Sequence, residues 1–381
     1  MAKLGEVATF YTGTAFPKEL QGNKTGKIPF YKVGDISKNV LAGHRRLTLC
    51  DNYVEKDVVK KIKGNIVPKD TVVFAKIGEA VKLNRRAITN QDCLVDNNVM
   101  GIAPIKSVMD IDYLYYYMCF IKLDKLAEST TVPSVKKGLI ENLNINLHNL
   151  DIQKRISKVL SGIDDLIQLR KKQLNALDLL VKSRFIELFG ECREERALID
   201  ICRFIDYRGK TPEKSEAGIP LITAKNVKDN AFSVEPQEFI PAENYSSVMT
   251  RGIPDVNDIL FTTEAPLGNV CRIPAVYEKF CVGQRIITMQ PNKDILTSEY
   301  LERALLTDKF QEKIWTNSSG STVKGIRSKL LEKLTIPIPP LEVQRDYTNF
   351  VAQVDKSKLA IQQSLEKLEA LKKSLMQEYF G

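Results

Sequence analysis

Histidine is scarce in this chain: His44 and His148 are the two histidines among 381 residues. Two isolated histidines leave little material for a histidine-based metal site or for a serine–histidine–aspartate triad. Neither the GxGxxG pattern of dinucleotide-binding folds nor the GxxxxGK[ST] pattern of P-loops occurs. The common classes of metal-dependent, hydrolytic and nucleotide-dependent enzymes are therefore poorly supported.

The cysteines form no recognisable framework. There are seven, an odd number, and no two are spaced as C-x-x-C. This scatter predicts reduced, mostly buried thiols instead of a disulfide frame or a zinc site. The residues are Cys50, Cys93, Cys119, Cys192, Cys202, Cys271 and Cys281.

Long apolar runs are also missing. No stretch approaches the roughly 20 apolar residues that a membrane-spanning helix needs, and the opening MAKLGEVATF lacks the long apolar core of a signal peptide. We therefore expect a cytoplasmic protein with no membrane partner.

The sequence does contain a second copy of itself. At a shift of 191, the 48 ungapped positions of 143–190 and 334–381 include 13 identities. The same shift aligns IPFYKVGDISKN from Ile28 with IPLITAKNVKDN from Ile219. Such a period is too long for a solenoid, so we infer two copies of a domain, each with a connector. The first residues of the identical pairs are Leu143, Ile145, Leu150, Gln153, Asp164, Leu174, Leu177, Leu180, Lys182, Ser183, Glu187, Phe189 and Gly190.

Charge differs between the copies. Residues 1–190 hold 30 Lys plus Arg against 20 Asp plus Glu, a net of +10, and residues 191–381 hold 26 against 27, a net of −1. A basic surplus suits a polyanionic partner, because lysine and arginine release counterions from phosphates. A merely basic soluble protein explains the charge equally well.

Each copy ends in a sequence typical of a long helix. Apolar residues recur at spacings of three and four from Asp151 onward and again after the IPIPP segment, and the two stretches end at Gly190 and Gly381. About 39 residues give a helix of roughly 58 Å. Because each apolar stripe must be buried, we expect the two helices to pair as a coiled coil. Antiparallel pairing would let helix length set the gap between two DNA half-sites, since one turn of B-DNA is about 34 Å.

The remainder of each copy predicts a mixed α/β domain. Runs 65–70 and 71–77 are typical of short strands, and helical patterns begin at Asp112 and at Ser298. The tyrosines after Asp112 could stack on bases, but their apolar helical pattern favours core packing.

Several segments resemble the specificity subunit of type I restriction-modification systems. They are 206–227, 329–347 with its PLEVQ motif, and the strands VVFAKIGE and ILFTTEAPLGNV, together with the paired helices. The first copy departs from this pattern at 145–156, where the prolines are lost but Leu150 and Gln153 are kept. The resemblance implies an α+β fold with two mixed α/β target recognition domains, two long helices paired as an antiparallel coiled coil, and an internal pseudo-twofold repeat. We expect recognition domains over 1–148 and 191–340 and spacer helices over 149–190 and 341–381.

The same resemblance implies a non-catalytic subunit that binds a bipartite, asymmetric target on double-stranded DNA. It would recruit two methyltransferase subunits, and restriction subunits would join the full complex. It would need no cofactor of its own, with S-adenosylmethionine, Mg and ATP used by the partner subunits.

Two other classes stay open at this stage. A stand-alone bifunctional restriction and methylation enzyme would need an N/D-P-P-Y/F loop, as the family resemblance implies, yet Pro339 and Pro340 run into Leu341. A nuclease motif could start at Pro254 and Asp255, but proline stands where lysine is wanted after Glu264. A protein-only coiled-coil scaffold would explain the helices but not two diversified, loop-rich domains.

Candidate DNA contacts lie in loops and strand ends at similar places in the two copies. Arginine and lysine pair with guanine, asparagine and glutamine pair with adenine, and any nearby cation binds phosphate. In the first copy the candidates are His44, Arg45, Arg46, Lys76, Lys82, Arg85 and Arg86. In the second copy they are Arg208, Lys210, Thr263, Asn269, Arg272, Gln284 and Arg285.

Overall fold

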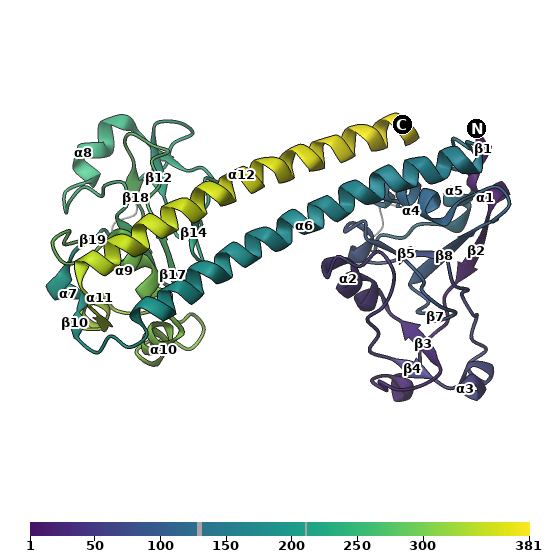
Figure 1. Cartoon of the computed structure of the whole chain (residues 1–381), viewed down its shortest axis with the longest axis horizontal. Helices are drawn as coiled ribbons and strands as arrows, with labels where there is room; N and C mark the ends of the chain where they lie inside the picture. Colours follow the sequence, from purple (N-terminus) through teal and green to yellow (C-terminus); the bar gives the residue numbers. More distant parts are fainter. Residues whose placement is uncertain (128–131, 210–211) are drawn as a thin grey trace. The chain divides into compact units, whose positions relative to one another are not determined.

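The computed structural model describes residues 1–127, 132–209 and 212–381, and they form two compact units. Unit 1 comprises residues 1–173 and 361–381, and unit 2 comprises residues 174–360. Two helices of 40 residues each, α6 (Leu150–Phe189) and α12 (Leu341–Phe380), contribute a segment to each unit. The two long helices expected from the apolar stripes are therefore present (Figure 1).

Unit 1 is built on a four-stranded antiparallel sheet in the order β2-β8-β5-β6. Helix α4 (Ile111–Phe120) packs on this sheet. A three-stranded sheet, β4-β3-β7, and the pair β1-β9 complete the β structure. The strands are β1 Ala2–Lys3, β2 Ala8–Thr12, β3 Ile28–Tyr31, β4 Tyr53–Val54, β5 Val72–Ala75, β6 Arg86–Ile88, β7 Leu94–Val95, β8 Val99–Pro104 and β9 Asn144–Ile145. Shorter helices are α1 Leu4–Val7, α2 Val33–Leu41, α3 Lys56–Lys61 and α5 Lys137–Glu141, with 3-10 turns η1 Lys18–Leu20, η2 Glu79–Val81 and η3 Leu123–Lys125.

Unit 2 repeats this topology. Its four-stranded sheet has the order β11-β19-β16-β17, its three-stranded sheet has the order β15-β12-β18, and β10 pairs with β20. The strands are β10 Glu195–Ala197, β11 Cys202–Asp206, β12 Ile219–Ile222, β13 Val227–Lys228, β14 Ala231–Phe232, β15 Phe239–Ile240, β16 Ile259–Thr263, β17 Leu267–Arg272, β18 Cys281–Val282, β19 Ile286–Pro291 and β20 Thr335–Pro337. The helices are α7 Leu198–Ile201, α8 Tyr245–Val248, α9 Ser298–Leu305, α10 Asp308–Thr316 and α11 Ser328–Leu331, with the 3-10 turn η4 Ala242–Asn244. The repeat found in the sequence is thus a repeat of fold.

The long helices run antiparallel in each unit. In unit 1, Lys372 of α12 contacts Asp164 of α6 at 2.5 Å, and Arg170 donates to Ser364 at 3.2 Å. In unit 2, Lys358 of α12 contacts Asp178 of α6 at 2.5 Å. Later residues of one helix meet earlier residues of the other, as antiparallel pairing requires. Part of each apolar stripe is buried, including Ile163 of α6 and Val354 of α12, whereas Val159, Leu166 and Leu371 remain exposed.

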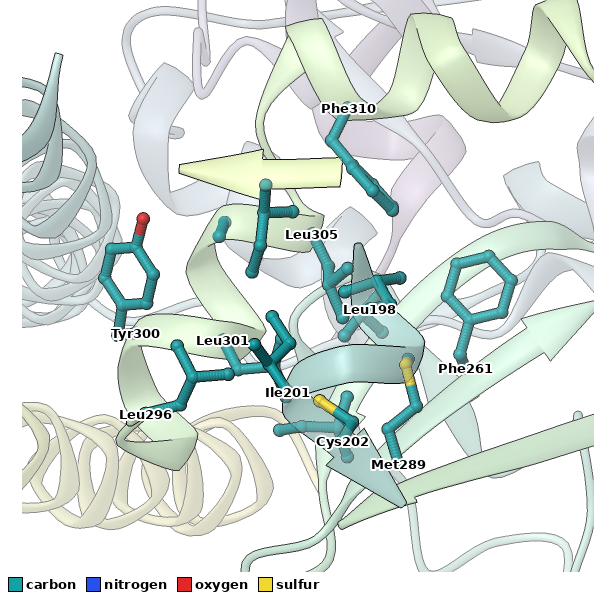
Figure 2. Close-up of a cluster of buried hydrophobic side chains, with 14 of the residues drawn as sticks. Leu198, Ile201, Cys202, Phe261, Met289, Leu296, Tyr300, Leu301, Leu305 and Phe310 are labelled. Atoms are coloured by element: carbon teal, nitrogen blue, oxygen red, sulfur yellow. The ribbon is translucent and has the colours of Figure 1, made fainter. Parts of the chain in front are cut away.

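Each unit has a core that joins its sheet to the long helices. In unit 2 the core includes Phe185 and Phe189 of α6 and Tyr347 of α12, packed against α9 and the sheet. Figure 2 shows part of this cluster, where Leu198, Ile201 and Cys202 meet side chains of β16, β19, α9 and α10. In unit 1, Tyr113, Tyr116 and Tyr117 of α4 are at most 2% exposed. The interpretation of this tyrosine cluster as core packing is therefore confirmed.

Two details of the local predictions were wrong. Residues 65–70 form no strand beyond a single bridge at Val67, because Pro68 has no N–H to donate and Asp70 adopts a positive φ of 63°. The helical pattern from Ser298 is interrupted at Leu306 and Thr307, where the Thr307 hydroxyl accepts a hydrogen bond from Phe310 N–H and caps α10. The expectation that most cysteines are buried is confirmed for Cys93, Cys202, Cys271 and Cys281, and the other three are partly buried.

Candidate nucleic-acid interface

A groove of about 340 Å³ lies beside the end of β16 in unit 2. Two backbone hydrogen bonds frame it, from Ile326 N–H to the Thr263 carbonyl at 3.1 Å and from Thr263 N–H to the Arg285 carbonyl at 2.9 Å. These bonds bring together segments that are distant in sequence. The lining residues are Arg208, Gly209, Thr263, Glu264, Gln284, Ser319, Val323, Gly325, Ile326 and Arg327.

Arg208 is held in the groove by a carboxylate. Its Nε lies 2.9 and 3.0 Å from the two oxygens of Asp206, and its Nη2 lies 2.6 Å from Oδ2. Nη1 also donates to the Ile326 carbonyl at 3.4 Å. Burial has the largest single effect and raises the pKa of Asp206, but the hydrogen bonds and charge of Arg208, with a hydrogen bond from Ser328, together hold that pKa below its ordinary value. The guanidinium is thus fixed in orientation by Asp206 and the Ile326 carbonyl, and its side chain is 28% exposed beside the groove.

The other predicted residues of this region surround the same strand end. Arg285 is exposed, and its Nε lies 3.2 Å from Oε1 of Glu264. Gln284 is half-buried in the groove wall. Thr263 is 2% exposed, and its hydroxyl donates to the Arg285 carbonyl at 3.3 Å, so it acts as part of the frame. The structure therefore brings Arg208, Gln284 and Arg285 together around Thr263.

Unit 1 has an equivalent position at the end of β5. Val135 N–H donates to the Lys76 carbonyl at 2.9 Å, and Lys76 N–H donates to the Asn98 carbonyl at 2.8 Å. These are the same two backbone bonds that frame Thr263, so Lys76 corresponds to Thr263 and Asn98 to Arg285. The Lys76 side chain is partly exposed and forms no hydrogen bond or ion pair with any residue that the structure describes.

Lys82 and Arg85 lie between η2 and β6, in the loop that follows Lys76. Lys82 is exposed and pairs with Glu79 at 2.8 Å. Arg85 is partly exposed, and within the described ranges its side chain has no hydrogen bond or ion pair. Lys76 and Arg85 thus give unit 1 two cations without a partner among the described residues, whereas the nearby Lys82 is paired with Glu79.

The predicted basic loop at His44, Arg45 and Arg46 is braced internally. Arg45 donates to the Tyr116 hydroxyl at 2.9 Å, and Arg46 pairs with Asp70 at 2.8 Å. The His44 ring lies 2.7 Å from the Thr48 hydroxyl. These contacts fix the loop against other parts of unit 1, and DNA binding by these residues stays a prediction.

Three predicted residues have structural partners in the interior. Arg86 is 2% exposed and donates to Asn84 and to the Ile121 carbonyl, and burial lowers its pKa. Arg272 pairs with Glu302 at 2.8 Å and with Glu299 at 2.7 Å. Asn269 donates to the Val227 carbonyl at 3.0 Å. These three side chains serve structural contacts and are not part of the candidate interface. Lys210 lies outside the described residues.

Sequence reasoning missed residues that the frame places beside the predicted ones. Arg327 lines the groove of unit 2 and is exposed. Its counterpart in the repeat is Lys136, which follows Val135 as Arg327 follows Ile326. Asn98 stands where unit 2 has Arg285. Extending the 191-residue shift a few positions upstream of Leu143 would have aligned Lys136 with Arg327.

Among the described residues, no group of three or more histidine, cysteine, aspartate or glutamate side chains could hold a metal ion. Over the same ranges, no helix combines the length and apolarity needed to cross a membrane.

Comparison with known proteins identifies one family. The model of the type I restriction modification DNA specificity domain matches the chain twice, over residues 1–179 and 193–372. The putative type I restriction enzyme MjaX specificity subunit of Methanocaldococcus jannaschii is 25% identical over 307 residues, covering 73% of this chain and 69% of its own length. The MjaVIII specificity subunit from the same organism is 23% identical over 308 residues, covering 74% and 72%.

Solved structures show the same fold. The S subunit of a type I restriction-modification system from M. genitalium superposes with a TM-score of 0.58 at 16% identity, covering all of this chain and 95% of its own. A chain from a study of complex assembly and conformational transition in the type I system gives a TM-score of 0.59 at 18% identity, covering 100% and 96%.

Proposed function

This chain belongs to the type I restriction-modification DNA specificity family, and on that premise we propose that it recognises the DNA target of such a system. The proposal rests on one observation: the pair of backbone hydrogen bonds at the end of β16 occurs again at the end of β5. Lys76 and Thr263 are held by the same backbone hydrogen bonds, while the side chains around them differ. One frame used twice with different side chains suits two different base sequences.

We propose a bipartite and asymmetric target on double-stranded DNA. Unit 1 offers Lys76, Arg85 and Lys136 around its frame, and unit 2 offers Arg208, Gln284, Arg285 and Arg327. Arginine and glutamine make bidentate contacts to guanine and adenine, whereas lysine side chains also bind phosphates. Since the two sets differ, the two half-sites should differ as well.

The long helices are proposed to set the gap between the half-sites. Each helix has 40 residues and contributes to both units. A continuous helix rises about 1.5 Å per residue and contains no loop, so its number of residues determines its length. The preferred gap in the DNA should then be fixed to within about one base pair.

We further propose that catalysis resides on other subunits. The chain would assemble with two methyltransferase subunits, and with restriction subunits in the full complex. S-adenosylmethionine, Mg and ATP would be used by those partners. In support, the relatives are named specificity subunits, and one solved structure comes from a study of complex assembly.

Selection from a random duplex library tests the proposal. The full chain, with its modification subunits if it needs them, is incubated with 40-base-pair duplexes of random sequence, and bound duplexes are sequenced. We expect two short fixed sequences that differ from each other and are separated by a constant gap. Enrichment of a single uninterrupted site, or cleavage or methyl transfer by the purified chain alone with S-adenosylmethionine and magnesium, would contradict the proposal.

A further inference from the structure

Two carboxylates lie at the groove of unit 2, where DNA binding alone does not explain them. Glu264 lines the groove, and Asp206 holds Arg208, which also lines it. A carboxylate repels the phosphates of a duplex, so each weakens electrostatic attraction at the place where the groove's arginines stand.

The two carboxylates hold these arginines in different ways. Asp206 and Arg208 are each 28% exposed as side chains and share a bidentate contact as short as 2.6 Å. Glu264 and Arg285 are 46% and 58% exposed and share one contact of 3.2 Å. The first pair orients its arginine, and the second is open enough to exchange with a ligand.

The repeat shows that these carboxylates accompany the arginines. Asp206 ends β11, and the corresponding strand of unit 1 ends in Thr12. Glu264 forms a backbone bridge with Gly325 as Ile77 does with Ser134. Unit 1 therefore has Thr12 and Ile77 in place of the acids and Asn98 in place of Arg285. Each carboxylate occurs in the copy that has the arginine, as expected if the two act together.

We propose that Asp206 and Glu264 are specificity-determining residues of the second half-site, which restrain Arg208 and Arg285 from binding phosphates of any sequence. A guanine presents O6 and N7 together and can take an arginine in a bidentate contact, which compensates for a carboxylate contact that is lost or shared. A single phosphate must approach the carboxylate and is repelled. This inference rests on the proposed function.

The consequence is a division of labour between the units. Lys76 and Arg85 of unit 1 have no carboxylate partner among the described residues, so unit 1 supplies the salt-sensitive attraction to any duplex. Unit 2 adds little attraction to a wrong sequence and contributes mainly when its own half-site is present. The net charges of +10 and −1 for the two halves of the sequence agree with this division.

The test compares Glu264→Gln with Glu194→Gln in the full chain. Glu194 also lies in unit 2 and pairs with an exposed arginine, Arg196, at 2.9 Å, but it does not line the groove. Each variant is measured on a fixed 40-base-pair duplex that lacks the selected target, and each is put through the random-duplex selection.

We expect Glu264→Gln to bind the non-target duplex about two- to fivefold more tightly, the range that loss of one exposed ion pair allows. Its salt dependence should steepen by up to about 0.9 in log–log slope if Arg285 gains one phosphate contact. In the selection, the second fixed sequence should become less well defined while the first is unchanged. Glu194→Gln should behave as the unmodified chain, and Asp206→Asn should change binding in the same direction as Glu264→Gln.

Three outcomes would overturn the inference alone, provided that the unmodified chain selects a two-part sequence. They are an unchanged profile for Glu264→Gln, weaker binding to the target with no gain on the non-target duplex, and an equal effect of Glu194→Gln. The second would mean that Glu264 contacts a base. Absence of any sequence preference in the unmodified chain would instead overturn the proposed function.

Discussion

At the scale of single residues, a buried glutamine that is identical in the two copies makes the same hydrogen bonds in each. Gln153 Oε1 accepts from Asp110 N–H, and its Nε2 donates to the carbonyls of Val108 and His148. Gln344 makes the same three bonds, to Thr297 N–H and to the carbonyls of Ile295 and Pro339. Both glutamines are fully buried, and each ties the start of a long helix to the loop before α4 or α9.

Replacing Gln344 by leucine should destabilise unit 2, because it leaves buried backbone groups without partners. We expect the free energy of unfolding to fall by about 2–4 kcal/mol. The chain has one tryptophan, Trp315, which lies in unit 2, so urea unfolding followed by its fluorescence measures the effect. Gln353→Leu, at an exposed position of α12, is the matched control and should change stability little. An equal loss in both variants would contradict this role.

Arg85 and Arg285 should each affect one half-site. Arg85→Ala is expected to relax base preference in one of the two selected sequences, and Arg285→Ala in the other, with a loss of about 1–3 kcal/mol of discrimination where a base contact is removed. Selection from random duplexes measures both. Affinity that falls equally for all sequences would show that these side chains contact phosphates instead.

The sequence could predict the type of these residues but not their surroundings. Arg85 and Arg86 are adjacent and equally basic, yet Arg85 is partly exposed and Arg86 is buried in β6. Adjacent residues of a strand point to opposite faces, and the local pattern does not show which face is covered by α4. Arg272 is likewise explained by Glu299 and Glu302, which are some thirty residues away and meet it only in the fold.

At the scale of elements, the antiparallel pair β10-β20 carries an anchored carboxylate. Glu195 of β10 accepts hydrogen bonds from the Thr335 hydroxyl of β20 and from Lys309 and Lys313 of α10, the lysines at 3.1 and 3.2 Å. The Thr335 hydrogen bond is the largest cause that lowers the pKa of Glu195, to about 2; burial opposes it, and the hydrogen bonds from the two lysines add to the lowering. The Glu195 carboxylate thus links helix α10 to both strands of the β10-β20 pair.

Because the pKa of Glu195 is lower in the folded state than in the unfolded state, its stabilising effect is present above about pH 4.5 and is lost as pH falls toward about 2. Glu195→Gln should therefore lower the melting temperature at pH 7. The difference from the unmodified chain should shrink as pH falls through that window. Calorimetry over a pH series measures this difference, with the exposed Glu191→Gln as control. A pH-independent difference would argue against the ionic role.

Elements with a long, regular signal were predictable, and those with a single local determinant were not. The apolar stripes of α6 and α12 extend over 40 residues each, so a few exceptions do not obscure them. The break between α9 and α10 depends on one capping residue, Thr307, within a continuous helical pattern. The missing strand at 65–70 depends on Pro68 and on the positive φ of Asp70.

At the scale of the whole molecule, the repeat in the sequence predicted the repeat in the fold because matched residues occupy equivalent positions in the two units. Identical residues around the helix starts are buried in both copies, as Gln153 and Gln344 are, whereas the identical Leu180 and Leu371 are exposed. The groove residues follow no such pattern, since Thr12, Ile77 and Asn98 stand where unit 2 has Asp206, Glu264 and Arg285. Similarity between copies thus identifies the architecture, whereas difference between copies identifies the candidate interface.

The central claim is that one chain recognises two DNA half-sites at a gap fixed by its helices. Affinity of the full chain, with its modification subunits if needed, is measured on duplexes that carry both selected half-sites, with the gap lengthened or shortened one base pair at a time. The account predicts a single sharp optimum, with affinity falling on either side and each half-site alone bound weakly. Equal affinity at every gap would contradict it.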